Sequence, residues 1–291
     1  MSQVLTDIST QTTNVPIVNV SPVAWPHKVD LFGVGYTPTN YDEAVQVICR
    51  AARQRVSAIV SCHAVHAVMT FCTNPQWRSK VNTFDMITPD GQPVRWALNL
   101  LYRAGLKDRV YGPELMDRLC RQAAKESIPI YLYGGTPDVL EKLKNQLCGR
   151  YAALRIVGAE APPFRPLTEA EDHAVVQRIN HSGAELVFIS LGCPKQDLFA
   201  FDHRAHLSAV QVCVGAAFDF HAGVKRTAPA WMQRCGLEWV FRLSCEPRRL
   251  WKRYLHTNSL FIAKLITALA ARIVKRRDPL PSVSDRADGT T

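Results

Sequence analysis

The 291-residue chain has 47% hydrophobic residues, enough to bury a substantial core in one large or two small domains. Its formal net charge of +10 is concentrated near the C-terminus, because residues 242–277 contain ten Lys or Arg and a single acid, Glu246. The remainder is close to neutral, so a partner attracted by charge is expected to meet only the C-terminal segment. No run reaches about 18 uninterrupted apolar residues, which argues against a conventional membrane span.

The nine cysteines are scattered singly, without a Cys-x-x-Cys pair or a histidine cluster at zinc-ligand spacing. This pattern favours reduced, mostly buried thiols in a cytosolic protein over disulfides or a metal site. The polar N-terminus lacks a basic region followed by an apolar core, so we expect no secretory signal. Residues 1–28 show little periodicity and are expected to form a loose arm.

Regular structure is expected from residue 29, where short apolar runs begin to alternate with amphipathic stretches. The runs predict strands, and the stretches between them predict helices. We expect strands at 31–34, 56–60, 81–87, 128–133, 154–157, 185–191 and 210–214, and helices at 41–53, 64–69, 92–103, 139–147 and 168–180, with another opening near residue 113. This alternation predicts right-handed βαβ units, and hence an α/β fold with a Rossmann-like parallel sheet flanked by helices over residues 29–240.

Polar side chains follow two of these strands. Asp90 lies in a Thr-Pro-Asp-Gly turn between a strand and a helix, and Ser61 and His63 come after the preceding strand. Parallel strands present their carboxyl ends at one edge, where ligands bind, and a carboxylate there can act as a general base. The alternatives are an Asp that fills the turn or caps the helix, and a His that is a hydrogen-bonded structural residue.

Glycines follow three more strand ends. Gly134 and Gly135 precede a helix, where backbone N–H groups can face a phosphate, although the full dinucleotide fingerprint and the Walker lysine are missing. Many α/β proteins use such glycines only to turn the chain. The other two strand ends place glycine near Lys195, Gln196 and Asp219.

Residues 241–277 are expected to form a basic amphipathic helical appendage. Cations alternate with aromatics over 246–254, and a helix of aliphatic residues is expected over 259–274. This composition is typical of a helix lying on anionic lipid, where each basic residue adds about 1 kcal/mol. The alternative is a packed helix with a solvated basic face. Nucleic-acid binding fits less well, because aromatics beside aliphatics suit a bilayer better than base stacking. Residues 278–291 are expected to be disordered.

Six segments together resemble the WecG/TagA/CpsF family, glycosyltransferase family 26, over nearly all of residues 30–255. They are Thr88-Pro89-Asp90-Gly91, Arg109-Val110-Tyr111-Gly112, Tyr133-Gly134-Gly135, Gly192-Cys193-Pro194-Lys195-Gln196, Val214-Gly215-Ala216-Ala217-Phe218-Asp219-Phe220, and the stretch from Gly236-Leu237-Glu238-Trp239 to Glu246-Pro247-Arg248-Arg249-Leu250. The resemblance implies an inverting enzyme without metal or cofactor, acting in cell-surface polysaccharide synthesis. It would move a hexosyl group (N-acetylmannosamine, its uronate or glucose) from a UDP-sugar to a polyprenyl-diphosphate-linked acceptor on the cytoplasmic membrane face.

The same resemblance implies roles for particular residues. Asp90 would be the general base, and Ser61 and His63 would position the donor sugar, with His63 standing where the family commonly has Asn. The UDP-sugar would be bound by Gly134, Gly135, Lys195, Gln196, Asp219 and Arg109, and the lipid diphosphate and membrane by Arg248, Arg249, Lys252 and Arg253. The chain could form a homo-oligomer. An NAD-dependent Rossmann-type oxidoreductase and a non-catalytic membrane-associated scaffold remain alternatives.

Overall fold

The computed structural model describes residues 22–277, with side chains up to residue 272. The elements are, in chain order, β1 (Val29–Leu31), β2 (Val34–Tyr36), α1 (Tyr41–Arg53), β3 (Ala58–His63), α2 (Val65–Thr73), α3 (Pro75–Asn82), β4 (Met86–Pro89), α4 (Gln92–Tyr102), α5 (Gly112–Glu126), β5 (Ile130–Gly134), α6 (Pro137–Arg150), β6 (Ile156–Glu160), α7 (Glu169–His181), β7 (Leu186–Ser190), α8 (Lys195–Asp202), β8 (Val210–Cys213), α9 (Ala217–His221), α10 (Ala230–Arg234), α11 (Glu238–Cys245) and α12 (Pro247–Arg277).

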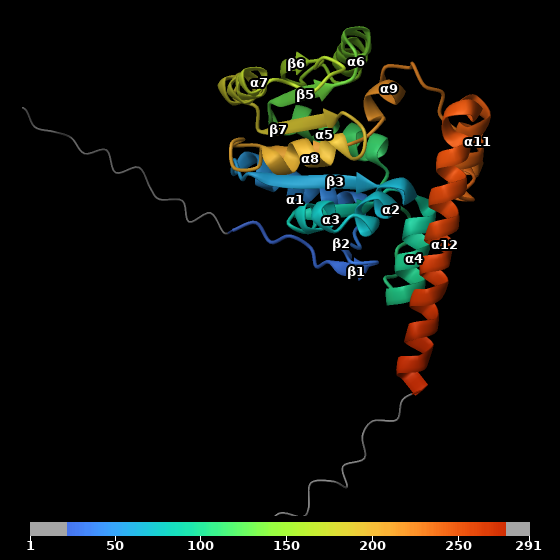
Figure 1. The fold of residues 1–291 in the computed structure, drawn as a ribbon. Coiled ribbons are helices and arrows are strands. Elements are labelled where there is room, and N and C mark those ends of the chain that lie inside the picture. Colours follow the sequence, from blue (N-terminus) through green and yellow to red (C-terminus); the bar gives the residue numbers. More distant parts are fainter. Residues whose placement is uncertain (1–21, 278–291) are drawn as a thin grey trace, which may run out of the picture.

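Six strands form one sheet in the order β4-β3-β8-β7-β5-β6, and every neighbouring pair is parallel. Helices cover both faces of this sheet (Figure 1). The predicted α/β fold with a Rossmann-like parallel sheet is therefore confirmed. Since all six strands run the same way, their carboxyl ends share one edge, which is where such folds bind ligands.

The alternation of side chains along the strands divides the core into two layers. In β5, Ile130 and Leu132 join the layer under α1, α5 and α6, whereas Tyr131 and Tyr133 join the layer under α2, α4, α7 and α8. Both layers contain fully buried aliphatic and aromatic side chains. A strand that is apolar on both faces appears in the sequence as a continuous apolar run, which is why these strands were predictable.

Two expected strands are different in the structure. The single strand expected at 31–34 is an antiparallel hairpin of β1 and β2, because Phe32 and Gly33 both adopt positive φ and reverse the chain. The strand expected at 81–87 begins only at Met86. Asn74 accepts a hydrogen bond from Trp77 N and so caps α3, which occupies the preceding residues.

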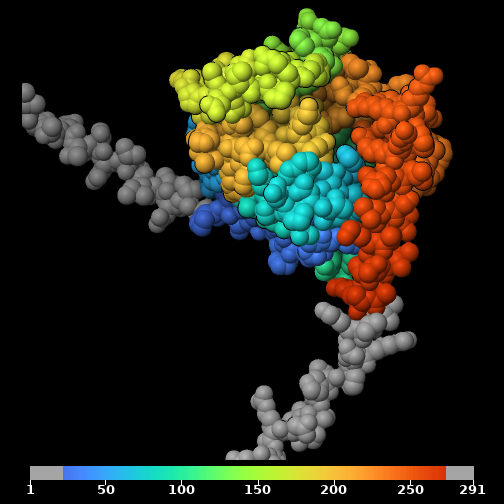
Figure 2. Space-filling model, viewed as in Figure 1, coloured from blue at the N-terminus to red at the C-terminus, as the bar shows by residue number. Residues whose placement is uncertain are grey.

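The C-terminal segment forms one helix where two segments were expected. α12 runs without a break from Pro247 to Arg277, since no glycine or proline separates its basic part from its aliphatic part. Figure 1 shows α12 alongside α4 and α2, at the edge toward which the arrows of β3 and β7 point. In the space-filling view it forms a continuous column against the core (Figure 2). Among the described helices, none combines the length and hydrophobicity needed to cross a membrane.

The predicted N-terminal arm and C-terminal tail fall largely beyond the part of the chain that can be described. Residues 1–21 and the whole tail at 278–291 lie outside the described residues. The last part of the arm is not loose, because Val23 and Trp25 pack against the buried core. All nine cysteines are free, and four of them are buried.

Candidate active site

Asp90 stands directly after β4, as the sequence predicts. The pairing of β4 with β3 continues one step beyond the strands, since Asp90 N donates to His63 O at 3.2 Å. The carboxylate accepts a hydrogen bond from Gly112 N, 2.8 Å from Asp90 Oδ2, at the amino end of α5. Two chain segments therefore fix Asp90, one through its backbone and one through its side chain.

A cavity of about 650 Å³ opens in front of Asp90, between the carboxyl edge of the sheet and the two C-terminal helices, α11 and α12. Both the core and the C-terminal helices contribute polar groups to its wall. These groups include Cys62, Asp90, Gln92, Arg109, Tyr111, Gln196, Glu238, Arg242, Arg249 and Arg253. Carboxylates and several cations thus face one space of a size that holds a small-molecule substrate.

The cavity wall changes the acidity of Asp90. Burial raises the pKa of Asp90 from its ordinary value of 3.8 to about 6, although Arg109 and the Gly112 N–H oppose that rise. The negative charge of Glu238 adds to it. Asp90 is therefore ionised at neutral pH, yet it is a stronger base than an exposed carboxylate.

Arg109 is held next to this carboxylate by the C-terminal helices. Its Nη2 lies 2.5 Å from Glu238 Oε2, and the side chains of both residues are almost fully buried. The guanidinium also stacks over the Tyr111 ring, 4.2 Å from its centre, and lies 3.4 Å from Gln233 Oε1. Arg109 thus joins α10 and α11 to the cavity, in addition to lining it.

Ser61 and His63 lie behind the cavity wall. The structure extends β3 to His63, so both side chains point to the face opposite Cys62, and neither lines the cavity. Asp197 Oδ1 accepts from Ser61 Oγ at 2.6 Å and lies 3.0 Å from His63 Nε2. Tyr36 completes this buried network at 3.1 Å from His63 Nδ1. The structural alternative for His63 fits this placement, and direct sugar contact by either residue does not.

The two glycines after β5 have structural tasks. A Cβ on Gly134 would lie 2.4 Å from the Ser190 carbonyl oxygen, so only glycine permits this approach of β5 to β7. The Gly135 N–H donates to that same carbonyl at 3.2 Å and is not free for a phosphate. These contacts favour the interpretation that the glycines turn the chain. Neither glycine lines the cavity, and their expected contact with UDP stays a prediction.

Of the other expected UDP-binding residues, some line the cavity and others do not. Gln196 lines the cavity, where its Oε1 accepts from Gly215 N at 3.1 Å. Lys195 is exposed beside it without lining the cavity. Asp219 forms an ion pair with Lys225 at 2.7 Å, and Lys225 is the member of that pair that lines the cavity.

The basic residues of α12 divide in the same way. Arg249 and Arg253 line the cavity, and Arg253 Nε is buried without a hydrogen-bond partner among the described residues. Arg248 and Lys252 are exposed on the outside of the helix. Arg242 of α11, which was not expected, also lines the cavity and lies over the Phe220 ring at 5.4 Å.

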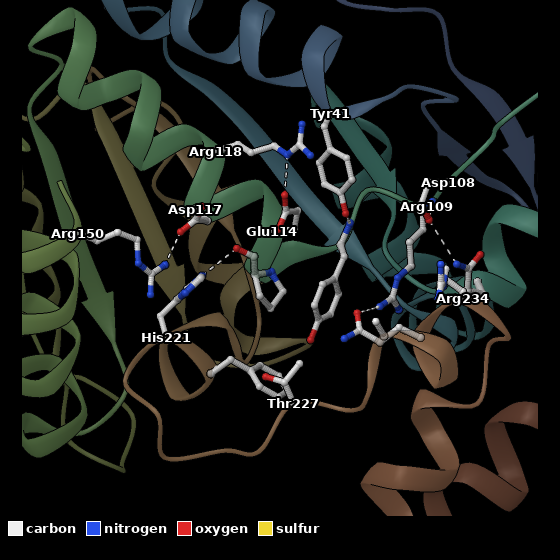
Figure 3. Close-up of a pocket in the computed structure, with 16 residues that line it drawn as sticks. Tyr41, Asp108, Arg109, Glu114, Asp117, Arg118, Arg150, His221, Thr227 and Arg234 are labelled. Carbon is white, nitrogen blue, oxygen red and sulfur yellow. Dashed lines mark hydrogen bonds and ion pairs between the residues drawn. The ribbon is translucent and has the colours of Figure 1, made fainter.

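A second cavity, of about 590 Å³, lies behind the first. The two share a wall, formed by Gln92, Arg109, Tyr111, Pro113 and Phe220. Figure 3 shows that two of its arginines pair with acids that also line it, Arg118 with Glu114 and Arg150 with Asp117. Two of its arginines are therefore neutralised by its own acids, and Arg109 is paired with Glu238. Within residues 22–277, no group of three or more His, Cys, Asp or Glu could hold a metal ion, and independence of metal stays a prediction.

Comparison with known families identifies the chain. The family model for the glycosyl transferase WecG/TagA/CpsF family matches residues 29–276. The chain belongs to that family. The match runs from β1 into the last turn of α12, so the WecG/TagA/CpsF unit includes both the sheet and the C-terminal helices that close the cavity.

Three residues that sequence reasoning did not select contribute to this candidate site: Gly112, Glu238 and Arg242. A Cβ on Gly112 would lie 2.8 Å from Val214 O and 3.2 Å from Asp90 Oδ2, so the carboxylate depends on a glycine here. Gly112 and Glu238 stand inside the quoted motifs, which was the available signal. Arg242 lies within the last of those stretches as well, in a segment whose basic charge was the additional signal.

Proposed function

We propose that this WecG/TagA/CpsF glycosyltransferase transfers a hexosyl group from a UDP-sugar to a polyprenyl-diphosphate-linked acceptor, with inversion and without a metal. The hexosyl group would be N-acetylmannosamine, its uronate or glucose. One observation carries the proposal: Asp90 faces a cavity whose wall also contains arginines from the C-terminal helices. Such a cavity brings a proton acceptor and anion-binding groups to the same substrate.

Asp90 would be the general base. As the acceptor oxygen bonds to the anomeric carbon, its proton passes to the Asp90 carboxylate, and the bond from that carbon to the UDP oxygen breaks with both electrons leaving on UDP. One carboxylate is sufficient, because the base forms no covalent intermediate. The Gly112 N–H keeps the carboxylate in place while one oxygen remains available to the acceptor.

The arginines would offset the charge of the diphosphates. Arg242, Arg249 and Arg253 line the cavity, and guanidinium groups match phosphate oxygens with paired hydrogen bonds. Gln196 and Lys225, on the sheet side of the cavity, would contact the donor. We assign Ser61 and His63 a supporting role: both contact Asp197, and Asp197 directly follows Gln196 at the start of α8.

The outer face of α12 would rest on the inner face of the cytoplasmic membrane. Trp251, Leu255 and Ile266 recur at helical spacing, do not line the cavity, and are each about half or more exposed (49%, 65% and 61%). The exposed cations Arg248 and Lys252 begin the same helix. Apolar residues beside cations are what an interfacial helix on anionic lipid requires.

Calorimetric titration of the purified protein with UDP, with and without magnesium, tests this function. We expect UDP to bind equally well in both conditions, because the cavity offers arginines in the place of a metal. UDP affinity that depends on magnesium would contradict the metal-independent part of the proposal.

Parallel titrations with NAD and a random oligonucleotide separate the alternatives. An oxidoreductase would bind NAD(H) and not UDP, and a nucleic-acid-binding protein would bind the oligonucleotide. A non-catalytic scaffold is excluded if the wild-type protein transfers sugar from any UDP-hexose to a lipid-diphosphate acceptor.

A further inference from the structure

Three buried charges meet where the C-terminal helices close the cavity. Arg109 lies between two carboxylates, Asp90 after β4 and Glu238 at the start of α11. Arg109 and Glu238 are exposed by only 7% and 9%. Both acids therefore act on the same buried cation, and the position of its guanidinium decides which of them it neutralises directly.

Arg109 forms its ion pair with Glu238 and not with Asp90. The guanidinium makes a 2.5 Å ion pair with Glu238, and the Tyr111 ring and Gln233 support that orientation. The Asp90 carboxylate accepts only from Gly112 N, and across the described residues it makes no ion pair within 4.0 Å. Glu238 thus keeps the Arg109 guanidinium from pairing with Asp90, the proposed general base.

Most of the other groups that face Asp90 carry no charge near neutral pH. Tyr41 of α1, Cys62 of β3 and Tyr111 before α5 all face Asp90, and burial raises the pKa of each, so all three are neutral near pH 7. Arg242 of α11 is the remaining charge that acts on Asp90 among the described residues. The ionic environment of Asp90 therefore comes from Arg109 and from two residues of α11.

We infer that Glu238 is a positioning residue that engages Arg109 and so keeps Asp90 basic when α11 is docked on the core. This inference rests on the proposed role of Asp90 as a general base. A bidentate arginine pair would stabilise the ionised carboxylate and weaken it as a proton acceptor. Because Glu238 begins α11, which leads directly into α12, docking of the C-terminal helices and activation of the base are the same event.

A titration of the unliganded protein tests the inference without requiring turnover. Aspartate carboxyl carbons are labelled with ¹³C, the Asp90 signal is assigned with Asp90→Asn, and its midpoint is followed by NMR. We expect Glu238→Gln, which keeps the shape of the side chain, to lower the Asp90 midpoint by about one pH unit. Glu238→Asp, which keeps the charge, should restore most of the wild-type value.

Glu185→Gln is the matched control, because Glu185 forms an exposed ion pair with Arg55 far from the cavity. It should leave the Asp90 midpoint unchanged. An unchanged or raised midpoint in Glu238→Gln, or an equal fall in Glu185→Gln, would overturn the inference. A lowered midpoint in a protein that transfers no sugar would support the electrostatic coupling and count against the proposed function alone.

Discussion

At the scale of single residues, Asp90 combines two properties that oppose each other. Its carboxylate is fixed by the Gly112 N–H, which favours the ionised form, and it is surrounded by protein, which favours the neutral form. Burial has the larger effect and raises the pKa to about 6. A base with this pKa is mostly ionised at neutral pH and still accepts protons more readily than an exposed aspartate.

The pH dependence of kcat/KM should report this group. The proposed general base acts in its ionised form, so we expect kcat/KM to rise with pH, to be half-maximal near pH 6, and to level off above it. Initial rates between pH 4.5 and 8 measure it, at a fixed subsaturating concentration of donor. A half-maximum near the ordinary value of 3.8 would show that burial does not control the base.

Burial of this charge should also reduce stability. Between 3.8 and about 6 the folded protein binds more protons at Asp90 than the unfolded chain does, so the free energy of unfolding falls as pH rises through that range. We expect Asp90→Asn to be more stable than wild type by about 1–3 kcal/mol at pH 7, and the difference to disappear below about pH 4. Urea unfolding of both proteins at pH 7 and below about pH 4 measures the difference in the free energy of unfolding under each condition. A less stable Asp90→Asn at pH 7 would contradict this reading.

Gly112 should be as sensitive as the carboxylate that it holds. A methyl group there meets Val214 O and Asp90 Oδ2 at 2.8 and 3.2 Å, so Gly112→Ala must displace one of them. We expect turnover to fall about 100-fold, the usual cost of a misplacement near 1 Å, with little change in helix content by circular dichroism. Gly149→Ala, in open space on α6, is the control and should keep wild-type turnover. Equal turnover of Gly112→Ala and Gly149→Ala would contradict a role for Gly112 in holding Asp90.

At the scale of elements, α12 has two distinct faces. Leu250 and Phe261 are buried against the core at 4% and 3% exposure, whereas Trp251, Leu255 and Ile266 lie away from that contact and are exposed to solvent. The inner face closes the cavity, and the residues away from it are exposed to solvent. The proposed membrane contact would therefore be coupled to closure of the cavity through a single helix.

Substitutions on the outer face should separate the two tasks. We expect Leu255→Glu combined with Ile266→Glu to weaken binding to anionic vesicles at least about 10-fold, because two apolar contacts become repelled charges. UDP affinity should be unchanged, since neither residue lines the cavity. Phe164→Glu is the control, as Phe164 is 89% exposed at another position. Vesicle sedimentation measures this binding. Binding of the double variant at the wild-type level would contradict the proposed contact of α12 with lipid.

The elements themselves were predictable where one local signal dominates. The buried strands are continuous apolar runs, and the Thr168 and Glu171 capping box marks the start of α7 as expected. The β1–β2 hairpin was missed because its turn is Phe32-Gly33, and Phe rarely adopts the positive φ that it has here. The change from basic to aliphatic residues along α12 does not mark a boundary, because a change in composition does not end a helix.

At the scale of the whole molecule, the site consists of contacts between distant parts of the chain. Arg109 and Glu238 are 129 positions apart, and Ser61 and Asp197 are 136 apart. The sequence placed Asp90 correctly because the end of a parallel strand fixes the position of the next residue. It could not show which face Ser61 and His63 occupy, since that depends on where β3 ends, and extending the strand to His63 turned both toward Asp197.

The central claim is that Asp90 is the base of a sugar transfer in this cavity. The most direct measurement compares wild type and Asp90→Asn for transfer of labelled hexose from UDP-sugars to a polyprenyl-diphosphate-linked acceptor in detergent, with UDP affinity measured on the same samples. We predict transfer by wild type, a loss of about 100-fold or more in Asp90→Asn, and UDP affinity within about twofold. Wild-type turnover in Asp90→Asn would contradict the account.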